Sequence, residues 1–166
     1  MSIRSEEKIT RLKVESIMTL DMEMEQKVSR LLNEQKLGVL ATFEPQQPYL
    51  SLIAFCHTPD LRRIIFATDR STRKYKNLIN NSRTAILFDN RIVSESNFRA
   101  GLVVTAYGST EELIGLDISM FRESYLEKHP NMRDFLYSSS TALLSLTVDY
   151  FQIVENFQNV TVLTMN

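Results

Sequence analysis

The chain has 166 residues, 43% of them hydrophobic and 23% charged, with a formal net charge of −1. This length fits one domain with a core that is stable without disulfides, and the near-neutral charge argues against a general nucleic-acid binder. The single cysteine, Cys56, has no partner for an internal disulfide, which fits a reducing compartment.

No stretch of the sequence approaches the ~20 consecutive apolar residues that span a bilayer. The first residues are charged, among them Glu6 and Lys8, and lack the apolar segment of a signal peptide. We therefore expect a cytoplasmic protein without membrane contact. Residues 1–20 are mixed in charge and weakly periodic, which predicts an N-terminal arm, and residues 21–166 are expected to form a single domain.

The first strong periodic pattern predicts a helix from about Asp21 to Lys36. Val28, Leu31 and Leu32 fall on one face of this helix. Asp21, with its short carboxylate side chain, is expected to cap the start. The helix should therefore pack against the rest of the protein through one apolar stripe.

Beyond this helix the pattern changes to apolar and β-branched runs separated by turn residues. A short helix interrupts these runs after residue 74, with Tyr75, Leu78 and Ile79 as its expected buried stripe. Gly108, inside a long run, is expected to mark a bend or a close approach between strands. The runs predicted as strands are 37–43, 49–58, 63–68, 83–88, 102–113, 143–154 and 160–165.

The polar residues 89–99 predict a loop, and further helices are expected at 115–128 and around 132–137. A doubly wound parallel sheet needs a crossover helix between most strands, and the chain from residue 37 to 68 has no room for one. We therefore predict a mainly β fold with flanking helices, built on a six- to seven-stranded antiparallel barrel.

A cationic segment lies where the third strand gives way to the short helix. Ser71 and Thr72 supply hydroxyl groups there, and Arg73 and Lys74 supply adjacent positive charges. Because the first N–H groups of a helix lack internal partners and carry the positive end of its dipole, this segment is a candidate phosphate site. A capped and solvated helix start is the alternative, since exposed cations there cost only roughly 0.3–1 kcal/mol each.

Other residues with reactive or metal-binding side chains give weaker signals. Cys56 lies in an apolar run and is interpreted as a buried small residue. His57 and His129 have no Cys or carboxylate at metal-ligand spacing, so no metal site is predicted. His129 is interpreted as the C-terminal residue of a helix, where partial positive charge is favourable. The sequence has no Walker loop, nucleophile elbow or dinucleotide glycine fingerprint, so no catalytic residue is assigned.

The order of these elements resembles that of the FMN-binding split-barrel family, which includes pyridoxamine 5'-phosphate oxidase. The resemblance is clearest from Met24 to Asp89. Its most specific part is the run from Ser71 to Lys74, which is similar to the family's Ser-Arg-Lys run that binds the FMN phosphate. The matching segments are 38–42, 48–55, 65–68 and 71–83.

The resemblance implies a split β-barrel and a homodimer that holds FMN at the subunit interface. Arg73 and Lys74 would bind the phosphate, and backbone groups of the second strand would approach the flavin ring. Thr68 and Thr72 would assist at the phosphate. The cofactor-binding residues implied in this way are Ser51, Leu52, Ile53, Ala54, Ala67, Thr68, Thr72, Arg73 and Lys74.

The function implied by the resemblance is an oxidoreductase that passes electrons from a nicotinamide-type donor to a small-molecule acceptor through FMN. The C-terminal half has no tryptophan and no Arg-containing tail like that of pyridoxamine 5'-phosphate oxidase, so vitamin B6 oxidation is not expected. A deazaflavin-dependent reductase and a non-catalytic flavin sensor or store are the alternatives. A haem-degrading relative is expected to carry an extra C-terminal domain or a histidine-bearing tail, and neither is recognised here.

Overall fold

The computed structural model describes residues 20–90, 101–156 and 159–165. Residues 1–19 of the expected arm and residues 91–99 of the expected loop lie outside the described residues. The strands are β1 (Leu37–Phe43), β2 (Pro48–His57), β3 (Arg63–Asp69), β4 (Arg83–Asp89), β5 (Leu102–Glu112), β6 (Thr141–Glu155) and β7 (Asn159–Thr164). The helices are one described over residues 20–34, α2 (Arg73–Asn80), α3 (Leu116–Lys128), the 3-10 helix η1 (Pro130–Met132) and α4 (Arg133–Tyr137).

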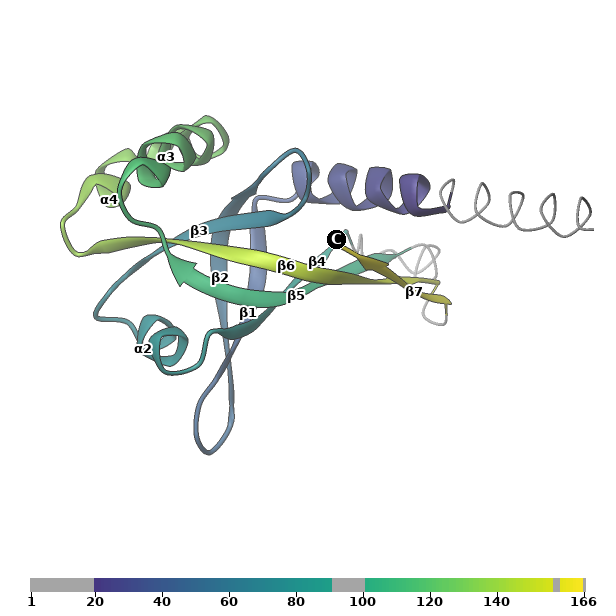
Figure 1. Ribbon diagram of the computed structural model, residues 1–166, viewed down its shortest axis with the longest axis horizontal. Helices are drawn as coiled ribbons and strands as arrows, with labels where there is room; N and C mark the ends of the chain where they lie inside the picture. Colours follow the sequence, from purple (N-terminus) through teal and green to yellow (C-terminus); the bar gives the residue numbers. More distant parts are fainter. Residues whose placement is uncertain (1–19, 91–100, 157–158, 166) are drawn as a thin grey trace, which may run out of the picture.

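All strands join one antiparallel sheet in the order β3-β2-β1-β4-β5-β6-β7, which closes into a barrel where β3 pairs with β6 (Figure 1). Six strands form the barrel, and β7 pairs with the second half of β6. β3 pairs with β6 along its full length but with β2 over only three residues, 55–57. The barrel is therefore split between the first half of β2 and the second half of β3. The predicted fold class is confirmed.

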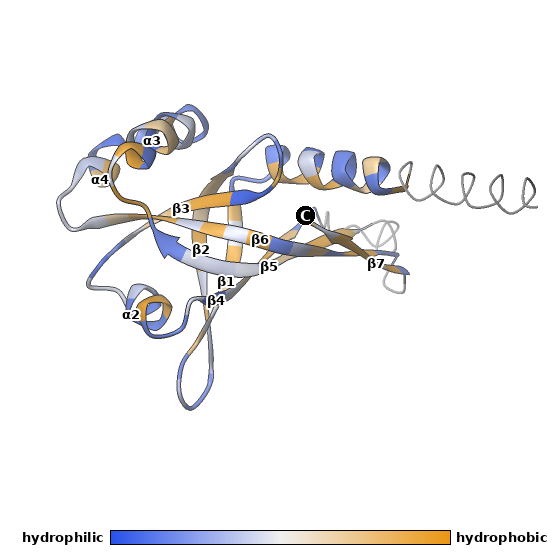
Figure 2. Cartoon of the chain, viewed as in Figure 1, coloured by the Kyte–Doolittle hydropathy of each residue, from blue (hydrophilic) through white to orange (hydrophobic). Residues whose placement is uncertain are grey.

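The main core fills the barrel and extends to the helices at its ends. Because side chains alternate along a strand, each strand turns one apolar face inward. The helix over residues 20–34 adds Val28, Leu31 and Leu32 to this core, as predicted. Figure 2 shows hydrophobic residues of this helix, in orange, along the side of the ribbon that lies nearer the barrel. Leu78 of α2 joins the same core, and Figure 1 places α2 on the opposite side of the barrel from that helix.

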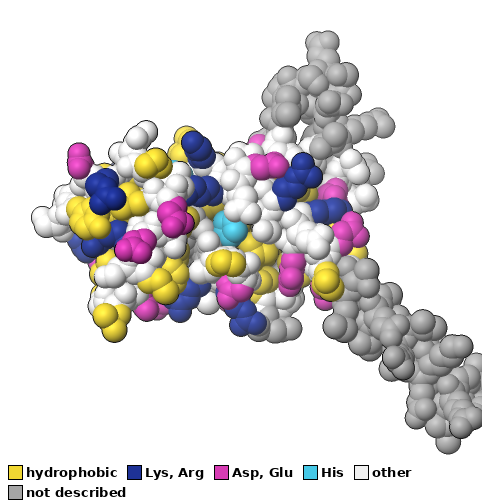
Figure 3. Space-filling model, turned by 90° about the horizontal axis from the view of Figure 1, so that it is seen from above, with side chains coloured by type: hydrophobic (Ala, Val, Ile, Leu, Met, Phe, Trp, Pro, Cys, Tyr) yellow, Lys and Arg dark blue, Asp and Glu magenta, His cyan; other side chains and the backbone are white. Residues whose placement is uncertain are grey.

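A second, smaller core lies outside the barrel, beneath α3 and α4. Tyr125 and Leu126 of α3 pack there on Cys56 and Ile65, whose side chains leave the outer face of β2 and β3. On this side of the molecule, charges of both signs alternate with exposed hydrophobic side chains (Figure 3). Within the described ranges no helix combines the length and the apolar character needed to cross a membrane.

Two details of the predicted helices are wrong. Asp21 does not cap the first helix, because Leu20 is already helical. Ile79 does not belong to the buried stripe of α2, since its side chain is 61% exposed. Asn77 is buried in its place, and its Nδ2 donates to Thr42 Oγ1 at 3.1 Å. The face of α2 that is turned inward therefore includes a polar contact with β1, between Asn77 and Thr42.

Gly108 marks the expected close approach between strands. The pairing of β5 with β6 shifts register between Tyr107 and Gly108, as in a β-bulge. A Cβ atom on Gly108 would lie 1.9 Å from the carbonyl oxygen of Thr147, a backbone atom that has no freedom to move aside. Only glycine therefore fits at this point of the sheet.

We expect Gly108→Ala to lower the free energy of unfolding by about 1–3 kcal/mol or more, because the added methyl group forces β5 and β6 apart. Chemical denaturation monitored by circular dichroism measures this change. Glu111→Ala, at an exposed position of the same strand, is the control and should shift stability by less than about 0.5 kcal/mol. Equal stability of the two variants would contradict the close approach.

Candidate functional site

The predicted phosphate segment forms a compact cluster where β3 leads into α2. Thr72 is the N-cap of α2: its Oγ1 accepts from the Tyr75 N–H at 3.4 Å and donates to the Asp69 carbonyl at 2.8 Å. The hydroxyl groups of Thr68 and Thr72 lie 2.9 Å apart. Arg73 and Lys74 are the first two residues of the helix. We call Thr68, Thr72, Arg73 and Lys74 the cradle.

Asp69 holds the loop in front of the cradle in shape. Its carboxylate accepts from the Ser140 hydroxyl and, at 2.7 Å, from the backbone N–H of Ser71. The hydrogen bond from Ser140, followed by those from Ser71, lowers the pKa of Asp69 to about 2. The loop therefore carries a permanent negative charge beside the helix start, and a second anion binds there only if the cradle cations outweigh it.

A group of side chains around Glu112 fixes the orientation of α2 against the sheet. The Glu112 carboxylate accepts from Arg70 Nε at 3.2 Å and from the Tyr75 hydroxyl at 2.6 Å. Burial opposes ionisation of Glu112, yet the hydrogen bonds from Arg70 and Tyr75 outweigh it and lower the pKa of the carboxyl. Arg70 is thus engaged in structure, and Arg73 and Lys74 are the remaining cations of the segment where β3 leads into α2.

Arg73 lies between the start of α2 and the β1–β2 hairpin. Its side chain is 59% exposed, and its guanidinium stands 5.5 Å from the centre of the Tyr49 ring and 3.5 Å from Glu44 Oε1. Lys74 is half-buried and has no ion-pair partner among the described residues. The cradle therefore holds one cation that is loosely paired and one that is unpaired within the described chain.

The predicted residues of β2 lie along the split in the barrel. Residues 48–54 pair with β1 on one side, and their other edge has no strand partner in the described parts of the chain. The Oγ of Ser51 is buried there without a hydrogen-bond partner among those residues. Leu52 is 65% exposed on the outer face of the barrel, whereas Ile53 belongs to the core.

The other two predicted backbone positions have structural partners already. The carbonyl of Ala54 accepts from the Tyr125 hydroxyl at 3.4 Å. Ala67 pairs with Leu143 in the β3–β6 ladder. The structure therefore brings the four cradle residues together and aligns Ser51 with the open edge. Ala54 is turned toward α3.

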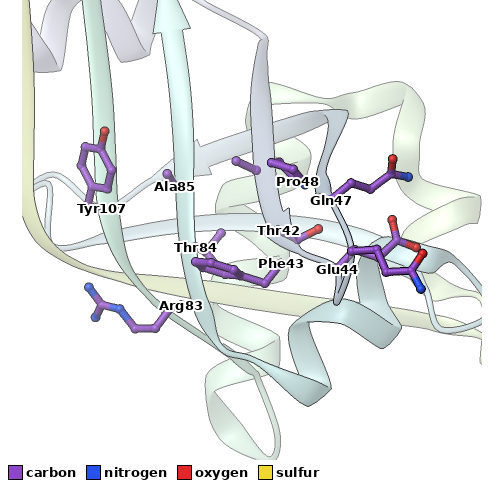
Figure 4. A pocket seen from close by; sticks show the side chains of 11 residues that line it. Thr42, Phe43, Glu44, Gln47, Pro48, Arg83, Thr84, Ala85 and Tyr107 are labelled. Carbon is purple, nitrogen blue, oxygen red and sulfur yellow. The ribbon is translucent and has the colours of Figure 1, made fainter.

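A hollow of about 680 Å³ lies on the outer face of β1 and β4, beside the β1–β2 hairpin. In Figure 4, Glu44 and Gln47 lie at one end of this hollow, and Arg83 and Tyr107 lie toward the other. Its size suits a small organic ligand. The sequence analysis missed this hollow, because its walls come from strands far apart in the chain.

The remaining reactive side chains lie away from the cradle, on the α3 side. Cys56 is buried, as predicted, and burial raises the pKa of its thiol to about 12. His129 ends α3, as predicted, but it is buried there and donates from Nε2 to the Phe55 carbonyl at 2.8 Å. Burial lowers its pKa, which disfavours the positive charge that is favourable at the end of a helix.

Comparison with known proteins places the chain in a family. Residues 24–154 match the family model described as pyridoxamine 5'-phosphate oxidase. The chain belongs to the pyridoxamine 5'-phosphate oxidase family. The resemblance seen in the sequence was clearest from Met24 to Asp89, and the family match extends well beyond that segment. Among curated proteins, no significant match to the chain was found.

Solved structures with the same fold share little sequence with this chain. A heme binding protein from Mycobacterium smegmatis is 17% identical over 81% of the chain, with a TM-score of 0.72, and the chain spans 55% of that protein. General Stress Protein 26 from Bacillus anthracis is 16% identical over 86% of the chain and 98% of its own length, with a TM-score of 0.67. A FAD-binding protein from Mesorhizobium loti is 15% identical over 76% and 90%, with a TM-score of 0.61.

Proposed function

We propose that this chain binds FMN through the cradle and acts as a flavin-dependent oxidoreductase. The observation that carries the proposal is the pair of cations, Arg73 and Lys74, at a capped helix start whose first turn contains no acidic residue. Two positive charges at this end interact unfavourably with the helix dipole. A phosphate dianion would offset this unfavourable interaction by accepting charge-assisted hydrogen bonds from both side chains. Family membership and a FAD-binding protein of the same fold support a flavin.

The residues at the split fit the rest of the cofactor. The open edge of β2 offers backbone hydrogen-bonding groups to the polar rim of a flavin ring. The buried Ser51 hydroxyl would gain a partner from the same ligand. Bound flavin would supply hydride and electron transfer between a nicotinamide-type donor and a small acceptor, while this chain would hold the ring and shape the pocket.

A deazaflavin cofactor is the second candidate, because its phosphate suits the same cradle. Haem is less well supported, although one structural neighbour is a heme binding protein. The ring nitrogens of His57 contact Thr58 and Asn33, and His129 is bound to Phe55. His57 thus lies beside the first helix and His129 at the end of α3, so neither is placed to hold a haem iron at the cradle.

The visible absorption spectrum of the purified protein, with mass spectrometry of the material released by heat, tests the cofactor. We expect an oxidised-flavin spectrum and the mass of FMN. Reduction of the bound flavin by a nicotinamide cofactor, with turnover on an acceptor, would support the enzyme, whereas tight binding without turnover would favour a sensor or store. A colourless protein that also rejects added FMN would contradict the proposal.

Removing a cradle cation should weaken FMN binding selectively. We expect Arg73→Ala or Lys74→Ala to cost roughly 1.5–3 kcal/mol of FMN binding energy, because each removes a charge-assisted contact to the phosphate. Fluorescence titration measures this, with riboflavin, which lacks the phosphate, as the ligand control. Lys76→Ala, an exposed cation in the next turn, should leave FMN affinity nearly unchanged. Full affinity in both cradle variants would refute the assignment.

A second copy of the chain is the proposed partner. Leu37, Phe43, Leu50 and Leu52 are 53–65% exposed on the outer face of β1 and β2. The strand register makes Leu52 a diagonal neighbour of Leu37 and Leu50 a diagonal neighbour of Phe43, since Leu52 pairs with Val39 and Leu50 with Ala41. An apolar patch of this kind favours protein association, and the hollow beside it would let two copies enclose a cofactor.

We expect light scattering to give the mass of a dimer for the wild-type chain. Leu50→Glu should shift it toward monomer, because a charge in the apolar patch would be desolvated on association. Leu116→Glu, at a 92% exposed apolar position on α3, introduces the same charge elsewhere and should stay dimeric. A stable FMN-loaded monomer of the wild-type chain would contradict this geometry.

A further inference from the structure

The carboxylate of Glu44 has fewer hydrogen-bond donors around it than it can accept from. Glu44 follows the last residue of β1, and its side chain is only 22% exposed. Oε1 stands 3.5 Å from Arg73 Nη1, a loose ion pair, and Oε2 is buried without a hydrogen-bond partner among the described residues. A buried carboxylate oxygen without donors is costly, and Arg73 is the one ion-pair partner of Glu44 among the described residues.

The contact between Glu44 and Arg73 follows from how the hairpin is attached to α2. Asn77 donates from the second turn of α2 to Thr42 Oγ1, and Thr42 donates in turn to the Tyr49 carbonyl at 3.4 Å. This buried tether holds the β1–β2 hairpin against the helix. Glu44 lies two residues after Thr42, and the tether therefore delivers its carboxylate to the first residue of α2.

We propose that Glu44 is an internal competitor that occupies Arg73 until a phosphate group displaces it, and that it thereby sets the affinity and charge selectivity of the cradle. The proposal rests on the function proposed above. Nη1 of Arg73 faces the Glu44 carboxylate, so a phosphate that takes this group as a donor gains its contact at the expense of the Glu44 pair. The dianion is also repelled by the carboxylate it displaces.

The hollow beside Glu44 offers an alternative position for the carboxylate once it is displaced from Arg73. The Glu44 side chain lines the hollow on the outer face, as do those of Gln46 and Gln47, and Figure 4 shows Glu44 and Gln47 at the same end. Both amides carry N–H donors that a carboxylate can accept from. Binding at the cradle would therefore move a negative charge toward the hollow. A neutral ligand would leave the Glu44–Arg73 pair intact.

Glu44→Gln tests the proposal, because glutamine keeps the shape of the side chain and removes its charge. We expect FMN to bind about five- to tenfold more tightly to this variant in fluorescence titrations, while riboflavin affinity changes less than about twofold. Glu34→Gln, which neutralises a carboxylate in an exposed ion pair with Arg30, is the matched control and should change neither affinity. Weaker or unchanged FMN binding by Glu44→Gln would overturn the proposal, since weaker binding would mean that Glu44 orients Arg73.

Two further measurements separate this proposal from the flavin assignment. Inorganic phosphate should raise the melting temperature of Glu44→Gln more than that of the wild type, whether or not FMN binds. If FMN fails with every variant and the phosphate effect persists, the competitor role stands and the flavin assignment fails. In the Arg73→Ala background, Glu44→Gln should gain clearly less than in the wild-type background, because the contest for Arg73 is gone and only the repulsion remains. A full gain there would contradict a contest for Arg73.

Discussion

The short pairing between β2 and β3 is the constraint on which the rest of the molecule depends. β3 pairs with β6 along its whole length on one edge, but with β2 over only three residues on the other. The pairing with β6 closes the barrel, and the short pairing with β2 leaves the first half of β2 with an open edge. The end of β3, and the start of α2 that follows it, therefore lie at the mouth of the split. These two pairings thus create both the open edge and the cationic helix start beside it.

Charge balance decides what the mouth of the split can bind. Arg70 is committed to Glu112, and Asp69 remains ionised through its hydrogen bonds with Ser140 and Ser71. Within the cradle, Arg73 and Lys74 remain to attract an anion, and Glu44 offsets part of that attraction. The cradle is therefore poised near neutrality, and a dianion with good hydrogen-bond geometry has an advantage there over a diffuse anion.

Local patterns predicted the order of the elements because each strand and helix has its own apolar periodicity, as Val28, Leu31 and Leu32 illustrate. The cradle was also visible, since the residues of its helix start are adjacent in sequence. Contacts between distant segments were not visible. The Asn77–Thr42 tether, which overrides the apolar pattern at Ile79, and the Glu44–Arg73 pair depend on how the hairpin meets α2. No local sequence pattern around these residues predicts how the hairpin packs on α2.

Hydrogen bonds from the α3 segment to the second half of β2 help to hold its open first half in place. The carbonyls of Ala54 and Phe55 accept from Tyr125 and His129 of the α3 segment. Lys128 donates to the Leu32 carbonyl at 2.6 Å, which ties α3 to the first helix as well. At the other end, Thr42 and Asn77 tie the hairpin to α2. A strand fixed at both ends loses little conformational entropy when a ligand pairs with its middle. In the proposed complex, α3 and the first helix would therefore support binding through β2, whereas α2 would contact the phosphate through Arg73 and Lys74.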